Sequence, residues 1–213
     1  AWLIQNWRFI ATLLGGFCFG GLAAGGLVAW LPTLVTRKFG LDNTQYGPIF
    51  GMINLVGALT MPLKGVIIDW LYKRGMTDAH ARFYSWALAA SLPIAIIAFT
   101  TTNLTVFYFG YAGLEIILIA FMFYMSATVQ MVTPVMMRGL VSGIFVSTCT
   151  AVATGMGSPL VAAVTDYGFG NKAALDKSLL AVSLVTISTA FVFIRLALPK
   201  IRAGMTATGA TQA

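Results

Sequence analysis

The sequence predicts an all-α membrane protein with six transmembrane helices. Hydrophobic residues make up 59% of the 213 residues and charged residues only 9%, whereas about a quarter of the residues of a soluble domain are charged. Six apolar stretches follow one another, each of the length that a helix needs to cross a bilayer, about 17 to 25 residues. Backbone polar groups must be paired within lipid, and no stretch alternates like the strands of a membrane barrel, so the stretches are expected to be helices.

The expected transmembrane unit spans residues 1–203. Its first stretch is too long and too rich in glycine for a cleaved signal peptide, and it is expected to end at Trp30-Leu31-Pro32, an interfacial aromatic residue before a helix breaker. The small, polar residues 204–213 predict a disordered tail. The six helices are expected at residues 9–31, 47–72, 83–101, 104–126, 140–165 and 178–198.

Glycines in the first stretch predict close helix packing, because small residues spaced four apart let two backbones approach each other. A helix that slides or bends during function is the alternative interpretation. The glycines form three pairs: Gly15 and Gly16, Gly20 and Gly21, and Gly25 and Gly26.

The positions of Lys and Arg predict the orientation in the membrane. Of the 13 basic residues, eight lie on the side that holds both termini and the second and fourth links, four lie on the opposite side, and Lys64 lies within a helix. Since basic loops stay in the cytoplasm, both ends of the segment are expected there. The net charge of +7 is thus explained by topology, and the absence of basic runs longer than two residues argues against nucleic-acid binding.

The cysteines and the histidine predict neither a cofactor nor a metal site. Cys18 and Cys149 lie in apolar stretches and are expected to be small buried residues without a disulfide. His80 is expected to be a solvated residue of the second link, with a pH sensor as the alternative.

A glycine and a charge cluster end the second stretch. Asp69 lies four residues before Lys73, so the two side chains share a helix face, and Gly65 lies one turn before Asp69. The missing side chain of Gly65 would let another helix approach. Arg74 and Gly75 complete the cluster, which either fixes the topology or forms a gate.

This cluster resembles the loop motif that transporters of the major facilitator superfamily carry after the second helix of each half. The nearest resemblance is to the spinster-like and organic-anion branches, and it covers nearly the whole chain. Trp70 stands where the family usually has Arg. Further matches to the C-terminal half, in family order, are Trp30-Leu-Pro32, Gly40-Leu41, Gln45-x-Gly47, Pro134-x-x-x-Arg138-Gly139 and Gly155-x-Gly157-Ser-Pro159.

The resemblance implies two inverted triplets of helices that form half of a major facilitator fold, with the substrate bound between two such halves. Ala1 stands in place of an initiator Met, so an N-terminal six-helix half is expected as the missing partner. The implied protein is a multi-pass secondary transporter of the bacterial inner membrane, surrounded by lipids, and not an enzyme. It would move a small organic solute, anionic or amphipathic, by proton-coupled alternating access.

Within the family the acid of the loop motif caps a helix of the opposite half, where an anion meets free N–H groups and the positive dipole end. The resemblance therefore implies that Gly65, Asp69, Lys73 and Arg74 form a cytoplasmic gate that holds the outward-open state.

Two ionisable residues are expected within the hydrocarbon, where such groups usually have a partner or line a cavity. Glu115 shares a helix face with Tyr108 and Tyr111. It is a candidate proton carrier or substrate contact, and by resemblance its helix borders the central cavity; a structural hydrogen bond is the alternative.

Lys64 lies with Asn54, Gly57 and Met61 on one side of the second helix. Lys64 is expected to contact an anionic substrate group or Glu115, or to extend its amine to the interface. Asn54 completes the set of candidate substrate and coupling residues.

Other functional classes explain the sequence less well. A self-standing six-helix channel or a homodimeric transporter also fits six spans. An intramembrane serine protease would use Gly139-Leu-Val-Ser142-Gly143 as a nucleophile turn, but the single histidine lies far from Ser142 in the sequence, in the second link.

Overall fold

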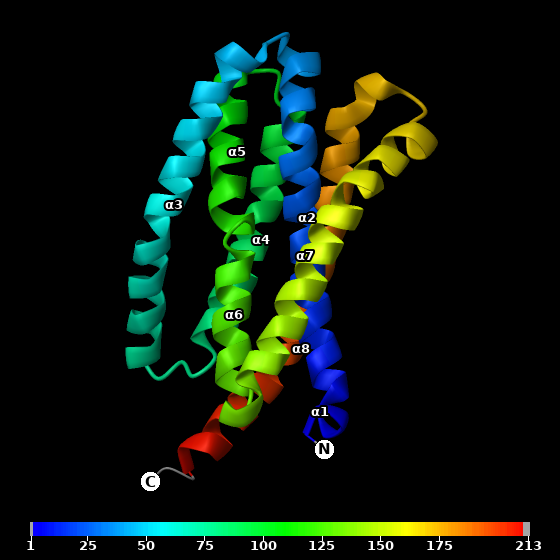
Figure 1. The fold of residues 1–213 in the computed structure, drawn as a ribbon. Coiled ribbons are helices and arrows are strands. Elements are labelled where there is room, and N and C mark those ends of the chain that lie inside the picture. The colour runs from blue at the N-terminus through cyan, green and yellow to red at the C-terminus, as the bar shows by residue number, and fades with distance from the viewer. Residues whose placement is uncertain (1, 211–213) are drawn as a thin grey trace.

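The computed structural model describes the backbone of residues 2–210 and the side chains of residues 2–203. All regular structure in this part of the chain is helical (Figure 1). Six helical spans within it are long and apolar enough to cross a membrane, so the predicted fold class is confirmed. The segments are α1 Trp2–Gln5, α2 Trp7–Phe39, α3 Asn43–Lys73, α4 Ala79–Thr100, α5 Leu104–Leu118, α6 Phe121–Val132, the 3-10 turn η1 Val135–Met137, α7 Arg138–Ala163, the π turn η2 Val164–Gly168, the 3-10 turn η3 Lys172–Ala174 and α8 Leu175–Ala210.

The first expected helix end was wrong. Helix α2 continues through Pro32 and ends at Phe39, before Gly40 with φ of 69°. Proline removes one backbone hydrogen bond, but Leu31 and Leu34 on either side of it are buried, and this packing holds the helix together. The indole Nε1 of Trp30 donates a hydrogen bond of 2.9 Å to the carbonyl of Ser158 in α7, and its place at the membrane interface stays a prediction.

The other bounds also differ from the expected ones. Helix α3 begins four residues earlier than expected, since Asp42 caps it and Gln45 completes a capping box. The expected helix 104–126 is two helices, α5 and α6, separated at Ile119 and Ala120. Helix α8 is described to Ala210. The tail expected at 204–213 falls on residues whose side chains lie outside the described part of the chain, and its disorder stays a prediction.

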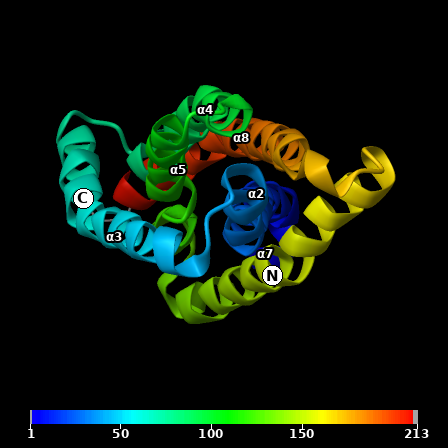
Figure 2. The same ribbon diagram turned by 90° about the horizontal axis from the view of Figure 1, so that it is seen from above.

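The spans pack around α2. Helix α2 packs mainly on α7 and α8, and α4 packs on α5 and α8. Seen from above, α2 lies near the centre, α4 and α8 lie side by side, and α3 stands at the periphery (Figure 2). The spans of α3 and α7 are the least covered, each with 17% of its most apolar stretch buried, whereas those of α4 and α8 have 39%. The equal coverage of α3 and α7 fits two triplets of helices in which these two helices take the same place.

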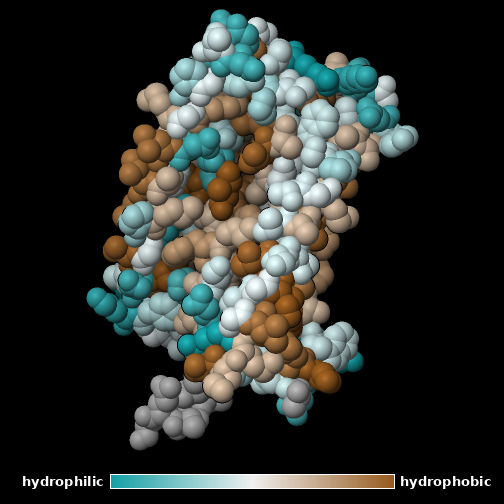
Figure 3. Space-filling view, viewed as in Figure 1, coloured by the Kyte–Doolittle hydropathy of each residue, from teal (hydrophilic) through white to brown (hydrophobic). Residues whose placement is uncertain are grey.

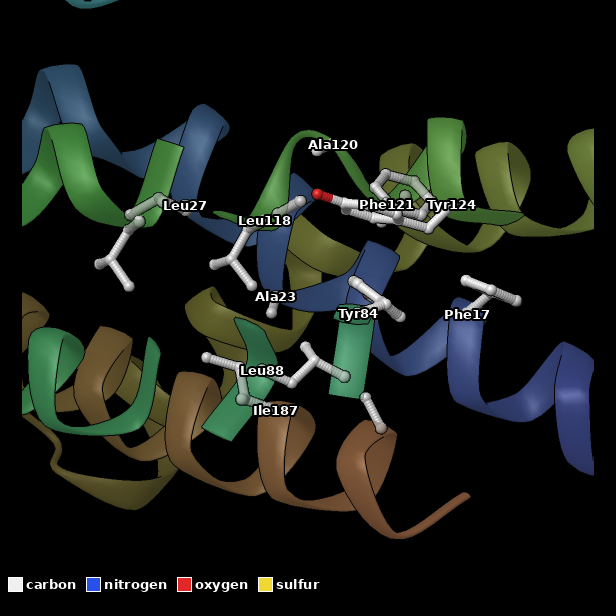
Figure 4. Close-up of a cluster of buried hydrophobic side chains, with 14 of the residues drawn as sticks. Phe17, Ala23, Leu27, Tyr84, Leu88, Leu118, Ala120, Phe121, Tyr124 and Ile187 are labelled. Carbon is white, nitrogen blue, oxygen red and sulfur yellow. The ribbon is translucent and has the colours of Figure 1, made fainter. Parts of the chain in front are cut away.

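A stack of aromatic rings forms the centre of the core. The ring of Tyr84 in α4 lies 5.3 Å from that of Phe17 in α2 and 5.3 Å from that of Tyr124 in α6. Leu118 and Ile187 belong to the same buried cluster (Figure 4). The stack joins three helices and fixes the position of α6 after the interruption.

The α2 glycines bring α2 and α7 into backbone contact, as predicted. A Cβ atom at Gly25 would overlap the carbonyl group of Ala153, and one at Gly157 would lie 2.7 Å from the backbone nitrogen of Gly26. We call this contact the α2–α7 seam. At one edge of the seam, a Cβ atom at Gly21 would lie 3.2 Å from the Cβ atom of Ala153.

On the face drawn in Figure 3, apolar side chains dominate the middle, and polar ones gather at the upper end and at the lower end of α3. Helix α3 exposes several large apolar residues, among them Met52, Leu55, Leu59, Leu63 and Val66. The start of α2 and the end of α8 lie at one end of the bundle, together with the α3–α4 link (Figure 1). The membrane side on which this end lies stays a prediction.

Candidate functional site

A groove between α3 and α5 brings two of the predicted site residues together. It has a volume of about 340 Å³ and is lined by Asn54, Gly57, Ala58, Met61, Glu115 and Ile119. Gly57 and the acid face each other, because a Cβ atom at Gly57 would lie in ordinary contact, 3.7 Å, with Cγ of Glu115. Asn54 and Glu115 thus share one cavity, although 61 positions separate them in the sequence.

The carboxyl group of Glu115 is buried without a full set of partners. Its residue is only 6% exposed, and its Oε2 atom has no hydrogen-bond partner among the described residues. A buried polar atom without a partner is costly, and such atoms in native structures call for an explanation. Here the unpartnered oxygen belongs to a residue that lines the groove, so a proton or a donor on a bound solute can satisfy it.

The interruption between α5 and α6 lies directly beside Glu115. Helix α5 ends at Leu118, and the last four carbonyl groups of a helix have no partner within it. The Nζ of Lys64 donates a hydrogen bond of 2.7 Å to one of them, the carbonyl of Ile116. A cation at this position also interacts favourably with the negative end of the helix dipole.

The position of Lys64 corrects the sequence interpretation. Lys64 is 6% exposed and turns inward to α5, so its amine does not extend to the interface. Nor do the described residues include an ion pair between Lys64 and Glu115. The Ile116 carbonyl, near the end of α5, accepts the hydrogen bond of Lys64 instead. No local sequence signal predicted this helix end.

The two predicted tyrosines pack beside the groove. Phe50 of α3 lies 5.0 Å from Tyr111 and 6.1 Å from Tyr108, measured between ring centroids. Tyr111 is buried, and the hydroxyl of Tyr108 has no hydrogen-bond partner among the described residues. Sequence reasoning missed Phe50, whose place one turn before Asn54 was the available signal.

The predicted gate residues lie on an uncovered part of α3. Asp69, Lys73 and Arg74 are exposed, and a Cβ atom at Gly65 would meet nothing within 4 Å. The described residues show no ion pair between Asp69 and Lys73; instead, the guanidinium of Arg74 lies 3.7 Å from the centroid of the Trp70 ring. Among the described residues, no ion pair joins this cluster to another helix.

The link between α3 and α4 contains a buried carboxylate that the sequence did not single out. Asp78, in the α3–α4 link, is 2% exposed and forms ion pairs of 3.0 Å with Arg82 and 2.7 Å with Arg202. Burial, the largest single influence, raises the pKa of Asp78, but the hydrogen bonds and charges of Arg202 and Arg82 outweigh it and leave the pKa below its usual value. These contacts tie the link to the end of α8.

Ser142 and His80, the pair that a serine protease would need, lie in different helices, α7 and α4. The Ser142 hydroxyl has no hydrogen-bond partner among the described residues, and no three His, Cys, Asp or Glu side chains in the searched part of the chain are grouped around a common point. His80 does not lie in a solvated loop; it begins α4, half-buried, with its ring 5.6 Å from Tyr72 and 6.1 Å from Phe123.

The fold defines a class of protein: a six-span helical bundle whose two least covered spans are α3 and α7. No protein-family model and no curated protein matches the sequence. Two solved structures match the fold, both of a bacterial homologue of the human lysosomal transporter Spinster, in inward-facing occupied and unoccupied conformations.

The occupied structure has a TM-score of 0.58 and 14% identity, and the match covers 92% of this chain and 48% of that one. The unoccupied structure has a TM-score of 0.58 and 13% identity, with 93% and 48% covered. The chain therefore spans about half the length of the proteins it matches. It has the fold of one half of a major facilitator transporter.

Proposed function

We propose that this chain is the C-terminal six-helix half of a secondary active transporter. It moves a small organic solute, anionic or amphipathic, by proton-coupled alternating access against an N-terminal half. The observation that carries this proposal is the buried carboxyl of Glu115, a residue that lines the groove of a half-transporter fold and whose Oε2 has no hydrogen-bond partner among the described residues.

Glu115 is the proposed proton carrier. Of the six acidic residues, it is the one that lies in the middle of a span and lines the groove. A charged carboxylate is expensive within a membrane, and no described cation pairs with it directly. Taking up and releasing a proton as the groove opens to one side and then the other lets this group couple proton movement to transport.

The groove suits a solute with both polar and apolar parts. Asn54 supplies an amide, and Met61 and Ile119 supply apolar surface. The Lys64 amine donates to the Ile116 carbonyl at 2.7 Å and lies 3.9 Å from the sulfur of Met61, which lines the groove. Its positive charge therefore stays beside the groove and favours an anionic group. Tyr108, Tyr111 and Phe50 extend the aromatic surface.

The uncovered cluster at the end of α3 is the proposed cytoplasmic gate. Asp69 would cap a helix of the other half, and Gly65 would let that helix approach. The exposure of Asp69, Lys73 and Arg74 leaves them available for this contact.

A homodimeric transporter or a self-standing channel is the second candidate. The open side of the bundle would then be covered by a second copy of the chain. The coverage of 48% of a two-half transporter favours the first proposal. The mass of the complex extracted from native membranes distinguishes the homodimer from the first proposal. A homodimer has twice the mass of its polypeptide, whereas a two-half transporter in one polypeptide has the mass of that polypeptide.

The test uses the protein encoded by the complete coding sequence, reconstituted in liposomes with a pH-sensitive dye inside. Adding members of a panel of organic anions is expected to drive proton movement for at least one of them. Glu115→Gln should abolish that movement while the protein still inserts. Asp166→Asn, which changes an exposed acid in the π turn η2, is the matched control and should behave as the unmodified protein. Unchanged proton movement in Glu115→Gln would refute the role of Glu115.

A further inference from the structure

The two cysteines of the chain meet at the edge of the α2–α7 seam. Cys18 in α2 and Cys149 in α7 are 131 positions apart in the sequence, yet their Sγ atoms lie 3.3 Å apart. Both are free thiols; Cys149 is buried and Cys18 is half-buried. The sequence interpretation, which expected two separate buried residues without a disulfide, missed this contact.

The two helices lie close together within about one turn of the pair. Gly21 lies three residues after Cys18, and Ala153 lies four residues after Cys149; a Cβ at Gly21 would be 3.2 Å from the Cβ of Ala153. A disulfide requires a sulfur–sulfur bond of about 2.05 Å and Cα atoms within about 7 Å. The sulfur atoms must therefore approach by about 1.2 Å, which small side-chain rotations can supply.

We propose that Cys18 and Cys149 are an oxidation site, at which a small two-electron thiol oxidant forms a disulfide that fixes α2 to α7. Two S–H bonds break and one S–S bond forms. The two protons and two electrons pass to the oxidant; with diamide, its N=N double bond becomes the N–N single bond of a hydrazine. The reaction does not depend on the proposed transport function.

The bridge would act on the tightest helix contact of the fold. Gly25, Gly26 and Gly157 form the seam through backbone contacts, with no side chain of theirs between the helices. A sliding motion of α2 along α7 changes these contacts, and a disulfide about two turns away prevents such a motion. Oxidation therefore locks the arrangement of α2 and α7 described above.

The test treats native membranes that contain the protein with diamide, which is small and uncharged, followed by unfolding and titration of free thiols with a maleimide. The expected result is joint loss of the Cys18 and Cys149 thiols, a cross-linked peptide pair that contains both residues, and recovery of both thiols with a reductant. Cys18→Ser and Cys149→Ser should each leave the remaining thiol free.

The matched control moves one thiol without removing it. Cys149→Ser combined with Ser147→Cys places the thiol two residues earlier, about 200° around the helix, at an exposed position. This variant should give no bridge to Cys18. The proposal is overturned if diamide leaves both native thiols free, or if the control variant forms the bridge as readily as the native pair.

Discussion

Lys64 donates a hydrogen bond of 2.7 Å to the carbonyl of Ile116 and thereby joins the middle of α3 to the end of α5. Ile116 directly follows Glu115, so Lys64 and Glu115 are linked through the backbone rather than by an ion pair. The amine holds the point at which α5 stops, and this point carries the carboxyl group that lines the groove.

Removing the Lys64 amine is expected to loosen the end of α5. Lys64→Met keeps the chain length but leaves the Ile116 carbonyl without this donor, which costs about 1 to 3 kcal/mol for a buried acceptor. Hydrogen exchange should become faster for the amides of residues 117–121, and Lys64→Arg should retain more of the protection. The control is Lys200→Met at an exposed position. Equal exchange in Lys64→Met and the unmodified chain would contradict this role.

Two glycine substitutions are expected to have opposite effects on the stability of the chain. Gly25→Ala forces a methyl group into the Ala153 carbonyl, and overpacking of this kind costs about 1 to 3 kcal/mol. Gly65→Ala meets nothing and gains about 0.5 to 1 kcal/mol of helix stability. Thermal unfolding in detergent measures both; a Gly25→Ala variant as stable as the unmodified chain would show that the seam is loose.

The same Gly65 is expected to matter once a second half is present. If the other half packs on this face of α3, then Gly65→Leu lowers the transport rate of the complete protein several-fold while the six-helix chain keeps its stability. Comparing transport with thermal unfolding separates the two effects. Full transport by Gly65→Leu would mean that no helix approaches there.

Asp78 is expected to make stability depend on acid. Its pKa in the folded chain lies below the ordinary value of 3.8, so its contribution is complete above that pH and is lost as the pH falls through the folded-state pKa. Asp78→Asn should lower the free energy of unfolding at neutral pH by about 1.5 to 3 kcal/mol. It should also make the loss of stability below pH 4 less steep. Unfolding temperatures measured across this pH range check it, with the exposed Asp69→Asn as control. If Asp78→Asn loses stability with falling pH as steeply as the unmodified chain, other groups cause that loss.

Signals within a few residues predicted much of the fold. Hydrophobic length gave the six spans, and the paired glycines of α2 predicted close packing that the seam with Ala153 and Gly157 confirms. Where tertiary contacts decide, these signals failed. Pro32 predicted a helix end, but the burial of Leu34 and Val35 after it keeps the helix continuous to Phe39.

The candidate site was only partly predictable for the same reason. Glu115 and Asn54 were found as polar residues in apolar stretches, but their meeting depends on how α3 lies on α5. The break after Leu118 involves neither glycine nor proline, so nothing local marks it. The pairs Cys18 with Cys149 and Asp78 with Arg202 join residues more than a hundred positions apart, beyond the reach of any local pattern.

The most direct test of the central claim asks whether water reaches the groove from both sides of the membrane. Ala58, which lines the groove and is exposed, is replaced by Cys in the complete protein with its native cysteines changed to Ser, and Val185→Cys on the outer face of α8 serves as control. A membrane-impermeant maleimide applied to one side and then the other should label Ala58→Cys from both sides and Val185→Cys from neither. Ala58→Cys that stays unlabelled from both sides, like the control, would show that the groove faces lipid and would contradict a transport pathway there.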